Sequence, residues 1–258
     1  MGNSVYKTIF IALTIMTFLV SSSFTMKEFF ENQQEKKDQN GFVVLELFTS
    51  QGCSSCPPAD AVLAQYANQN NPNIIPLAFH VDYWNRLGWS DPFSKSEFTQ
   101  RQNNYASNLN TEENYTPQII INGKHELVGS YKSEIANIVT KELKIKSNFN
   151  VSIKSASVKN NLLNIEFEAD TNQNTVLNLA LVKKKEFTSI NRGENSGLKQ
   201  TSYNIVFDFK TISKFTKNNN KSSFQFNSDK IPSDYLVVAY LQNSNTGVVI
   251  GATKSEIN

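Results

Sequence analysis

The feature that most constrains this chain is an apolar run that leads directly into its only two cysteines. Residues 43–48 have the sequence VVLELF and are bounded by Gly41 and Gly52, so they predict a buried central strand. Cys53 and Cys56 follow just beyond the carboxyl end of that strand, in the sequence CSSC. Reactive sites of open α/β sheets lie at such strand ends, so this position favours a functional pair of cysteines.

The spacing of the cysteines favours a redox-active disulfide over a stabilising one. Closing a loop with only two intervening residues removes little chain entropy from the unfolded state. Strained or exposed disulfides are the ones that exchange with other thiols. We therefore expect thiol–disulfide chemistry in which Cys53 faces solvent and attacks, while Cys56 leads into a helix and resolves the mixed disulfide.

Metal binding is the alternative use of these cysteines. The chain also has two histidines, His80 and His125, and two Cys with two His would make a closed zinc site. His125 follows the hairpin signal Asn122-Gly123, which puts it about 15 Å from the cysteines at ~3.3 Å per strand residue. We expect no zinc site and no cofactor, whereas a Cu(I) site made by Cys53 and Cys56 with His80 nearby stays open.

Length and charge set outer limits on the protein. Its 258 residues are consistent with one or two domains. The formal net charge is +2, from 25 basic and 23 acidic residues, and removal of Lys7 with an export signal would leave +1. This near-neutral balance gives no indication of binding to nucleic acid or to an acidic membrane.

The amino terminus has the pattern of an export signal. Lys7 precedes a twelve-residue apolar core at residues 9–20, and residues 21–23 are small serines suited to cleavage. Spanning a membrane takes about 20 apolar residues, so we expect a cleaved signal over residues 1–25 rather than an anchor. The mature protein would be periplasmic or secreted, without stable membrane association, and would begin with a tether at residues 26–40.

Residues 41–146 are predicted to form an α/β unit around the cysteines. A helix over residues 59–70 follows the first strand, and residues 74–82 form a second buried strand. A right-handed parallel connection brings the carboxyl end of this second strand beside the cysteines. His80 and Asp82 share one face of it, and we expect them to form a polar pair there.

A long polar and aromatic insertion follows at residues 83–115. Phe98, Arg101 and Tyr105 lie on one helical face within it. Because the insertion follows a strand end at the site, we expect it to form a lid or a wall. A proline-led hairpin and a last helix over residues 131–146 complete the unit.

The pattern changes at residue 147. Seven short alternating runs follow, separated by Asn, Gly and Ser, and predict a β-sandwich-like domain over residues 147–258. One charged loop in this region, NRGENSG at residues 191–197, is bracketed by glycines. A solvated turn is the favoured interpretation of this loop, and a functional site is the alternative.

The order of these elements resembles the thioredoxin fold, in which a cis-proline lies against the disulfide where this chain has Thr116-Pro117. More specifically, the chain resembles an exported bacterial thioredoxin-like family catalogued as domain of unknown function 1223. The phrases that carry this resemblance are ELFTSQGCSSCPPAD, AFHVDYW, LGWSDPF, RQNNYA, YTPQIIING, RGENSG and GVVIGAT. The resemblance implies an α/β thioredoxin-like domain with a long helical insertion, then an all-β sandwich-like domain. It implies a redox site of Cys53, Cys56 and Pro117, and no particular substrate.

The chain departs from thioredoxin at the buried acid that helps to deprotonate the second thiol. Leu47 stands at that position, six residues before Cys53, and Glu46 points to the other face of the strand. We therefore expect His80 or Asp82 to supply the missing base. The residues expected to support the site are Thr116, His80, Asp82, Glu46, Trp84, Arg101 and Tyr105.

Two prolines after the cysteines affect the helix start. If Cys53 were the cap, Pro57 and Pro58 would remove backbone donors that point toward it. Regular helix is therefore expected to begin only near Pro58.

The favoured function is an exported thiol-disulfide oxidoreductase whose partner is a protein thiol or disulfide. The alternatives are a non-enzymatic Cu(I)-binding or delivery module and a partner-binding protein whose CxxC is permanently oxidised.

Overall fold

The computed structural model describes residues 41–111, 114–227 and 229–258. The signal and tether predicted at residues 1–40 lie outside the described residues. Among the helices of the described ranges, none is long and apolar enough to cross a membrane.

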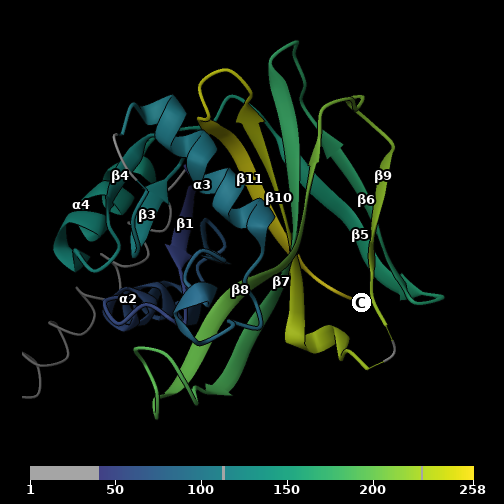
Figure 1. Ribbon diagram of the computed structural model, residues 1–258. Helices are drawn as coiled ribbons and strands as arrows, with labels where there is room; N and C mark the ends of the chain where they lie inside the picture. The colour runs from purple at the N-terminus through teal and green to yellow at the C-terminus, as the bar shows by residue number, and fades with distance from the viewer. Residues whose placement is uncertain (1–40, 112–113, 228) are drawn as a thin grey trace, which may run out of the picture. The chain divides into compact units, whose positions relative to one another are not determined.

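The first half of the described chain alternates strands and helices (Figure 1). Its elements are β1 (Val43–Thr49), α2 (Pro57–Asn68), β2 (Ile74–His80), a 3-10 turn (Asn85–Leu87), α3 (Ser96–Leu109), β3 (Gln118–Ile121), β4 (His125–Val128) and α4 (Lys132–Glu142). β1 pairs in parallel with β2 and antiparallel with β3, and β3 forms a hairpin with β4. The hydrophobic patterns predicted β1, α2, β2 and α4 to within four residues at each end.

The second half is almost entirely strand. Its elements are β5 (Val151–Lys159), β6 (Leu162–Ala169), β7 (Thr175–Ser189), β8 (Lys199–Ile212), β9 (Asn220–Gln225), a 3-10 turn (Pro232–Asp234), β10 (Tyr235–Asn243) and β11 (Val249–Glu256). One mixed sheet of eight strands has the order β11-β10-β7-β8-β2-β1-β3-β4, and β5, β6 and β9 form a separate sheet of three. The large sheet crosses the boundary predicted at residue 146, because β8 pairs in parallel with β2. Gly41–Asn258 accordingly forms one compact unit.

The reason for this continuity is that β10 and the first half of β7 are mostly apolar on both faces. Successive strand residues point to opposite faces of a sheet, so a run without polar residues must be covered twice. One face of these strands belongs to the core that contains Phe48, Phe79, Ala180, Val238 and Tyr240. The other face packs against the three-stranded sheet in the core that contains Leu163, Phe224, Leu179, Leu181 and Val237.

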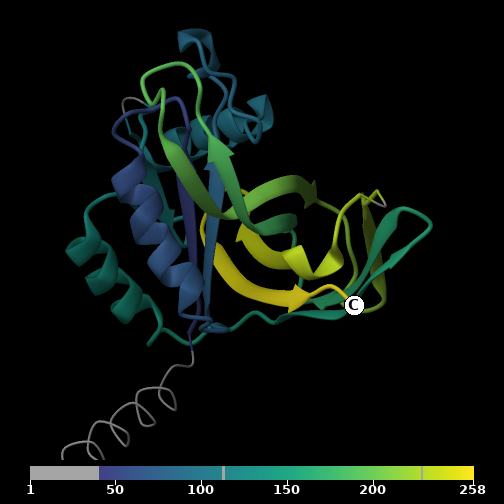
Figure 2. The same ribbon diagram turned by 90° about the horizontal axis from the view of Figure 1, so that it is seen from below.

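Helices cover the two faces of the central strands. On one face α2 and α4 pack over Leu45 and Leu47 through Leu63 and Ile135. Figure 2 shows these two helices along one side of the strands, with the three-stranded sheet at the far side of the molecule. On the opposite face, α3 contributes side chains to the core that includes β10. The cysteines lie where α2 begins, on the α2 face.

The turn between β3 and β4 joins the two ends of the large sheet. The side-chain oxygen of Asn122 accepts a hydrogen bond from the amide of Val44 at 2.8 Å. The carbonyl of Asn122 accepts one from the amide of Val249 at 2.9 Å. Gly123 has a φ of 66°, and a Cβ there would overlap the carbonyl oxygen of Gly247. The sheet therefore curls until β11 reaches this turn, and only glycine fits the contact.

Candidate functional site

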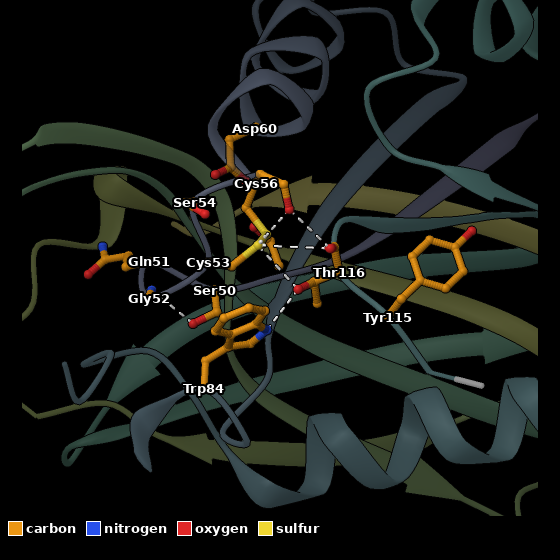
Figure 3. The surroundings of a disulfide bond; sticks show 12 residues. Ser50, Gln51, Gly52, Cys53, Ser54, Cys56, Asp60, Trp84, Tyr115 and Thr116 are labelled. Atoms are coloured by element: carbon orange, nitrogen blue, oxygen red, sulfur yellow. Dashed lines mark hydrogen bonds between the residues drawn. A yellow bond between two sulfur atoms is a disulfide. The ribbon is translucent and has the colours of Figure 1, made fainter. Parts of the chain in front are cut away.

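Cys53 and Cys56 form a disulfide just beyond the end of β1 (Figure 3), with their Cα atoms 5.4 Å apart. The amide of Cys56 donates to the carbonyl of Cys53 at 3.2 Å, which closes a tight turn. α2 begins at Pro57 with Cys56 as its cap, one residue earlier than the sequence suggested. Proline suits this first helical position because its missing amide hydrogen has no partner there.

The sulfur of Cys53 has hydroxyl groups around it. The Thr116 hydroxyl donates to Cys53 Sγ at 3.3 Å, and Ser55 Oγ lies 3.4 Å from the same sulfur. The indole N–H of Trp84 donates to Thr116 Oγ1 at 2.8 Å, which leaves the threonine hydrogen directed at the sulfur. The Thr116–Pro117 peptide bond is cis. The structure thus brings Thr116 and Trp84 to the cysteines, as the sequence predicted.

Neither cysteine faces solvent, so the expectation that Cys53 is exposed is wrong. Both residues are 0% exposed. The loop at residues 191–197, which connects β7 to β8, bonds the backbone around Cys53. Asn195 Nδ2 donates to the carbonyl oxygens of Gln51 and Cys53, each at 2.9 Å, and Glu194 Oε2 accepts from the amide of Ser54 at 3.1 Å.

This loop was interpreted from the sequence as a solvated turn, and most of it is exposed, but Asn195 and Glu194 also bond the residues around Cys53. About 140 residues separate its side chains from their partners, so no local pattern could have revealed the contact. The one available signal was that RGENSG is among the phrases that carry the family resemblance.

His80 pairs with Asp91, and the predicted pair with Asp82 does not form. His80 Nδ1 lies 2.7 Å from Asp91 Oδ2, which also accepts from the amide of Gln51 at 2.8 Å. β2 ends at His80, and Asp82 instead accepts from the Thr99 hydroxyl at 2.6 Å. Among the described residues, Nε2 of His80 is buried without a hydrogen-bond partner.

Pairing stabilises the charged form of both His80 and Asp91. Burial lowers the pKa of His80, but its contact with Asp91 outweighs burial, so the pKa lies above its usual value of 6.5. Burial raises the pKa of Asp91, but the charge of His80 and hydrogen bonds outweigh it, so the pKa lies below 3.8. His80 is therefore held toward its cationic form, which makes it a poor proton acceptor.

Asp60 is a candidate site residue that sequence reasoning missed. It lies one turn into α2, where its amide donates to the carbonyl of Cys56 at 3.1 Å. Helical side chains lean toward the helix amino terminus, which is where Cys56 lies. Its carboxylate accepts from the Thr49 hydroxyl at 2.9 Å and from Gln200 Nε2 at 2.8 Å. The available signal was the spacing of four residues after Cys56.

Burial raises the pKa of Asp60 to about 6, against the opposing charge of His80. A carboxyl group that titrates there can take up and release a proton near neutral pH. It lies on the same face of the sheet as Thr49 and His80, which are partners in the β1–β2 register.

Glu46, Arg101 and Tyr105 are not brought to the cysteines. Arg101 Nε donates to Glu46 Oε2 at 2.6 Å, and the Tyr105 hydroxyl donates to Glu46 Oε1 at 2.7 Å. The guanidinium carbon lies 4.9 Å from the centre of the Phe209 ring. Because Glu46 points to the α3 face, these residues attach α3 to the sheet on the side opposite to the disulfide. The part of the insertion that lines the site is its beginning, which contributes Trp84, Trp89 and Asp91.

The second histidine of the chain, His125, does not lie at the cysteines. His125 Nε2 lies 3.0 Å from Glu142 Oε1, in the hairpin region away from the disulfide. Within residues 41–111, 114–227 and 229–258, no group of three or more His, Cys, Asp or Glu residues is arranged to hold a metal ion.

The sequence matches one family model, and the fold is similar to those of solved structures. A family model described as "Protein of unknown function (DUF1223)" matches residues 44–242. The crystal structure of protein AGR_C_4864 from Agrobacterium tumefaciens is 27% identical, with a TM-score of 0.64, over 82% of this chain and 92% of that one. HBP35 of Porphyromonas gingivalis is 15% identical, with a TM-score of 0.61, over 84% of this chain and 76% of that one. No curated protein is a significant match to the sequence.

Proposed function

The chain belongs to the DUF1223 family, and from this premise we propose that it is an exported, thioredoxin-like thiol-disulfide oxidoreductase. The observation that carries the proposal is the Cys53–Cys56 disulfide at the end of β1, in contact with Thr116. The order of β1, α2, β2 and the β3–β4 hairpin supports a thioredoxin-like assignment. The pattern of residues 1–25 supports export, where a disulfide can persist and exchange with a partner.

The proposed reaction is exchange through a mixed disulfide. The thiolate of Cys53 attacks one sulfur of a substrate disulfide, forming the mixed disulfide and releasing one substrate thiolate. Cys56 then loses its proton and attacks Cys53 Sγ, which re-forms the Cys53–Cys56 bond and releases the second substrate thiolate. Run in reverse, the same two steps oxidise a substrate dithiol and reduce the protein.

Cys53 is assigned as the nucleophile because of the hydroxyls beside its sulfur. A thiolate is stabilised by donors that already point at it. Thr116 is such a donor, because its oxygen accepts the Trp84 N–H at one lone pair and its own hydrogen is left for Sγ. Cys56 is at the start of α2, closer to Asp60, which suits it for resolution.

Asp60 is assigned as the proton acceptor for Cys56, in place of His80 or Asp82. Its carboxylate is held by Thr49 and Gln200, and its pKa of about 6 leaves it ionised and able to accept at neutral pH. Asp91 holds His80 toward its cation. The charge of His80 lowers the pKa of Asp60 and so partly offsets the effect of burial.

Trapping of the mixed disulfide tests this function. The reduced Cys56→Ser variant, mixed with a disulfide substrate, should accumulate a covalent adduct through Cys53, because no thiol is left to release it. The Cys53→Ser variant should form no adduct and show no exchange. Adducts on Cys56 in place of Cys53 would reverse the two roles, and adducts on neither would contradict the oxidoreductase.

One observation favours a second candidate. Both cysteines are fully buried, as expected for a partner-binding protein whose disulfide stays oxidised. The two candidates differ in whether the disulfide is ever reduced.

A further inference from the structure

We infer that the β7–β8 loop is a strap that keeps Cys53 closed to small thiols and opens for a polypeptide thiol. The strap is defined here as residues 191–197. This inference rests on the proposed function, because it specifies the substrate class of the same disulfide. Its geometry, however, is independent of catalysis.

The strap occupies the backbone groups around Cys53. Asn195 bonds the carbonyl oxygens of Gln51 and Cys53, and Glu194 bonds the amide of Ser54. Residues 51–54 are called the redox loop here. An extended peptide that paired with this loop would use these same backbone carbonyl and amide groups. The strap thus takes the place of a bound peptide from within the same chain.

A second contact holds the strap against Trp89, which lies in the insertion that follows β2. A Cβ on Gly193 would lie 3.1 Å from the Cβ of Trp89, so the backbone of the strap packs tightly there. The Trp89 indole N–H in turn donates to Gln51 Oε1 at 3.2 Å. The strap, Trp89 and the redox loop are therefore joined at Gln51, in addition to the bond that the strap makes at Cys53.

The strap lies against a buried Cys53, whose carbonyl oxygen it bonds. Ser54 and Ser55 are exposed, while the cysteine beside them is 0% exposed. A thiol must approach Sγ along the axis of the disulfide to exchange with it. A small thiol can react only in the fraction of molecules whose strap is open. A polypeptide can shift that fraction, because its own backbone competes for the groups that Asn195 and Glu194 occupy.

The strap contacts are weak enough to open. A single hydrogen bond changes an equilibrium constant by about two- to twelvefold. Removing the two bonds of Asn195 should therefore raise the open fraction by about tenfold, and the rate of reduction by a small thiol should rise with it.

The experiment follows reduction of the disulfide in the full-length protein by tryptophan fluorescence. The two tryptophans of the chain, Trp84 and Trp89, both line the site. The variant is Asn195→Asp, which keeps the size of the side chain and loses its donor. The matched control is Ser196→Ala, because Ser196 Oγ bonds only Asn191 within the strap among the described residues. The reductants are dithiothreitol and reduced, unfolded ribonuclease A.

We expect Asn195→Asp to react about tenfold faster than the wild type with dithiothreitol, and Ser196→Ala to match the wild type. With the unfolded ribonuclease the acceleration should be much smaller, because the polypeptide already displaces the strap. An unchanged rate with dithiothreitol, or equal acceleration with both reductants, would overturn the inference. If these rates were observed but the reduced Cys56→Ser variant trapped no disulfide substrate, the proposed function would be contradicted and the strap would stand.

Discussion

At the scale of the residue, the environment of Asp60 decides how the second half of the reaction proceeds. Asp60→Asn should slow the release of a mixed disulfide roughly 100-fold at neutral pH, because it removes the acceptor for the Cys56 proton. In the wild type this step should slow as the pH falls below about 6, where Asp60 becomes protonated. The inflection should vanish in the variant. Stopped-flow measurement of release against pH checks this.

The same substitution should leave the fold intact. Oε1 of Gln200 is buried without a partner within the described part of the chain. The Gln200 amide can turn over and accept from the new Asn amide. A folded variant with an unchanged pH profile would remove Asp60 from the mechanism.

The His80–Asp91 pair gives the stability of the protein a pH dependence. The raised pKa of His80 means that its contribution is complete below 6.5 and is lost as the pH rises through the folded-state value. The lowered pKa of Asp91 means that its contribution is present above 3.8 and is lost as the pH falls. The raised pKa of Asp60 also favours folding on the acidic side of about 6.

We therefore expect the free energy of unfolding in urea to be highest at mildly acidic pH and to decline above 6.5. His80→Asn keeps a donor for Asp91 and should flatten the decline. A wild-type stability that rises from pH 6.5 toward alkaline values would contradict this assignment.

At the scale of the element, the β3–β4 turn should be the more sensitive of two left-handed glycines. Gly123 and Gly197 have φ values of 66° and 87°. A Cβ on Gly123 would overlap the carbonyl of Gly247, whereas nothing lies within 4 Å of one on Gly197. Gly197→Ala should cost ~1–2 kcal/mol of stability, the conformational penalty alone, and Gly123→Ala clearly more. Equal losses in urea denaturation would show that the turn does not constrain the sheet.

The elements show which parts of the structure sequence patterns can predict. β1, α2 and β2 were predicted because their periodicities and boundaries are local, and the cysteines were located by them. The strands β7 and β10 were predicted too, but not their sheet, since a run that is apolar on both faces does not indicate its partners. Asn195 and Asp60 were missed as site residues for different reasons: the first makes contacts distant in sequence, and the second is an ordinary acidic residue of a first helical turn.

At the scale of the whole molecule, the two halves share one core. β8 pairs with β2, and Val238 and Tyr240 of β10 pack with Phe48 of β1 and Phe79 of β2. A fragment of residues 41–146 would expose this surface to water. It should lack a cooperative urea transition and protected amides in hydrogen exchange, unlike residues 41–258. A fragment that unfolds cooperatively with native protection would show that the α/β half is an independent domain.

The most direct test of the central claim is the equilibrium between the Cys53–Cys56 disulfide and glutathione buffers of known potential. We predict reversible reduction, at a potential above the roughly −300 mV that marks structural disulfides, because the short loop contributes little to stability and the sulfur of Cys53 has donors ready for a thiolate. A disulfide that stays oxidised across all glutathione ratios, after times long enough for the strap to open, would contradict the oxidoreductase and favour a partner-binding protein.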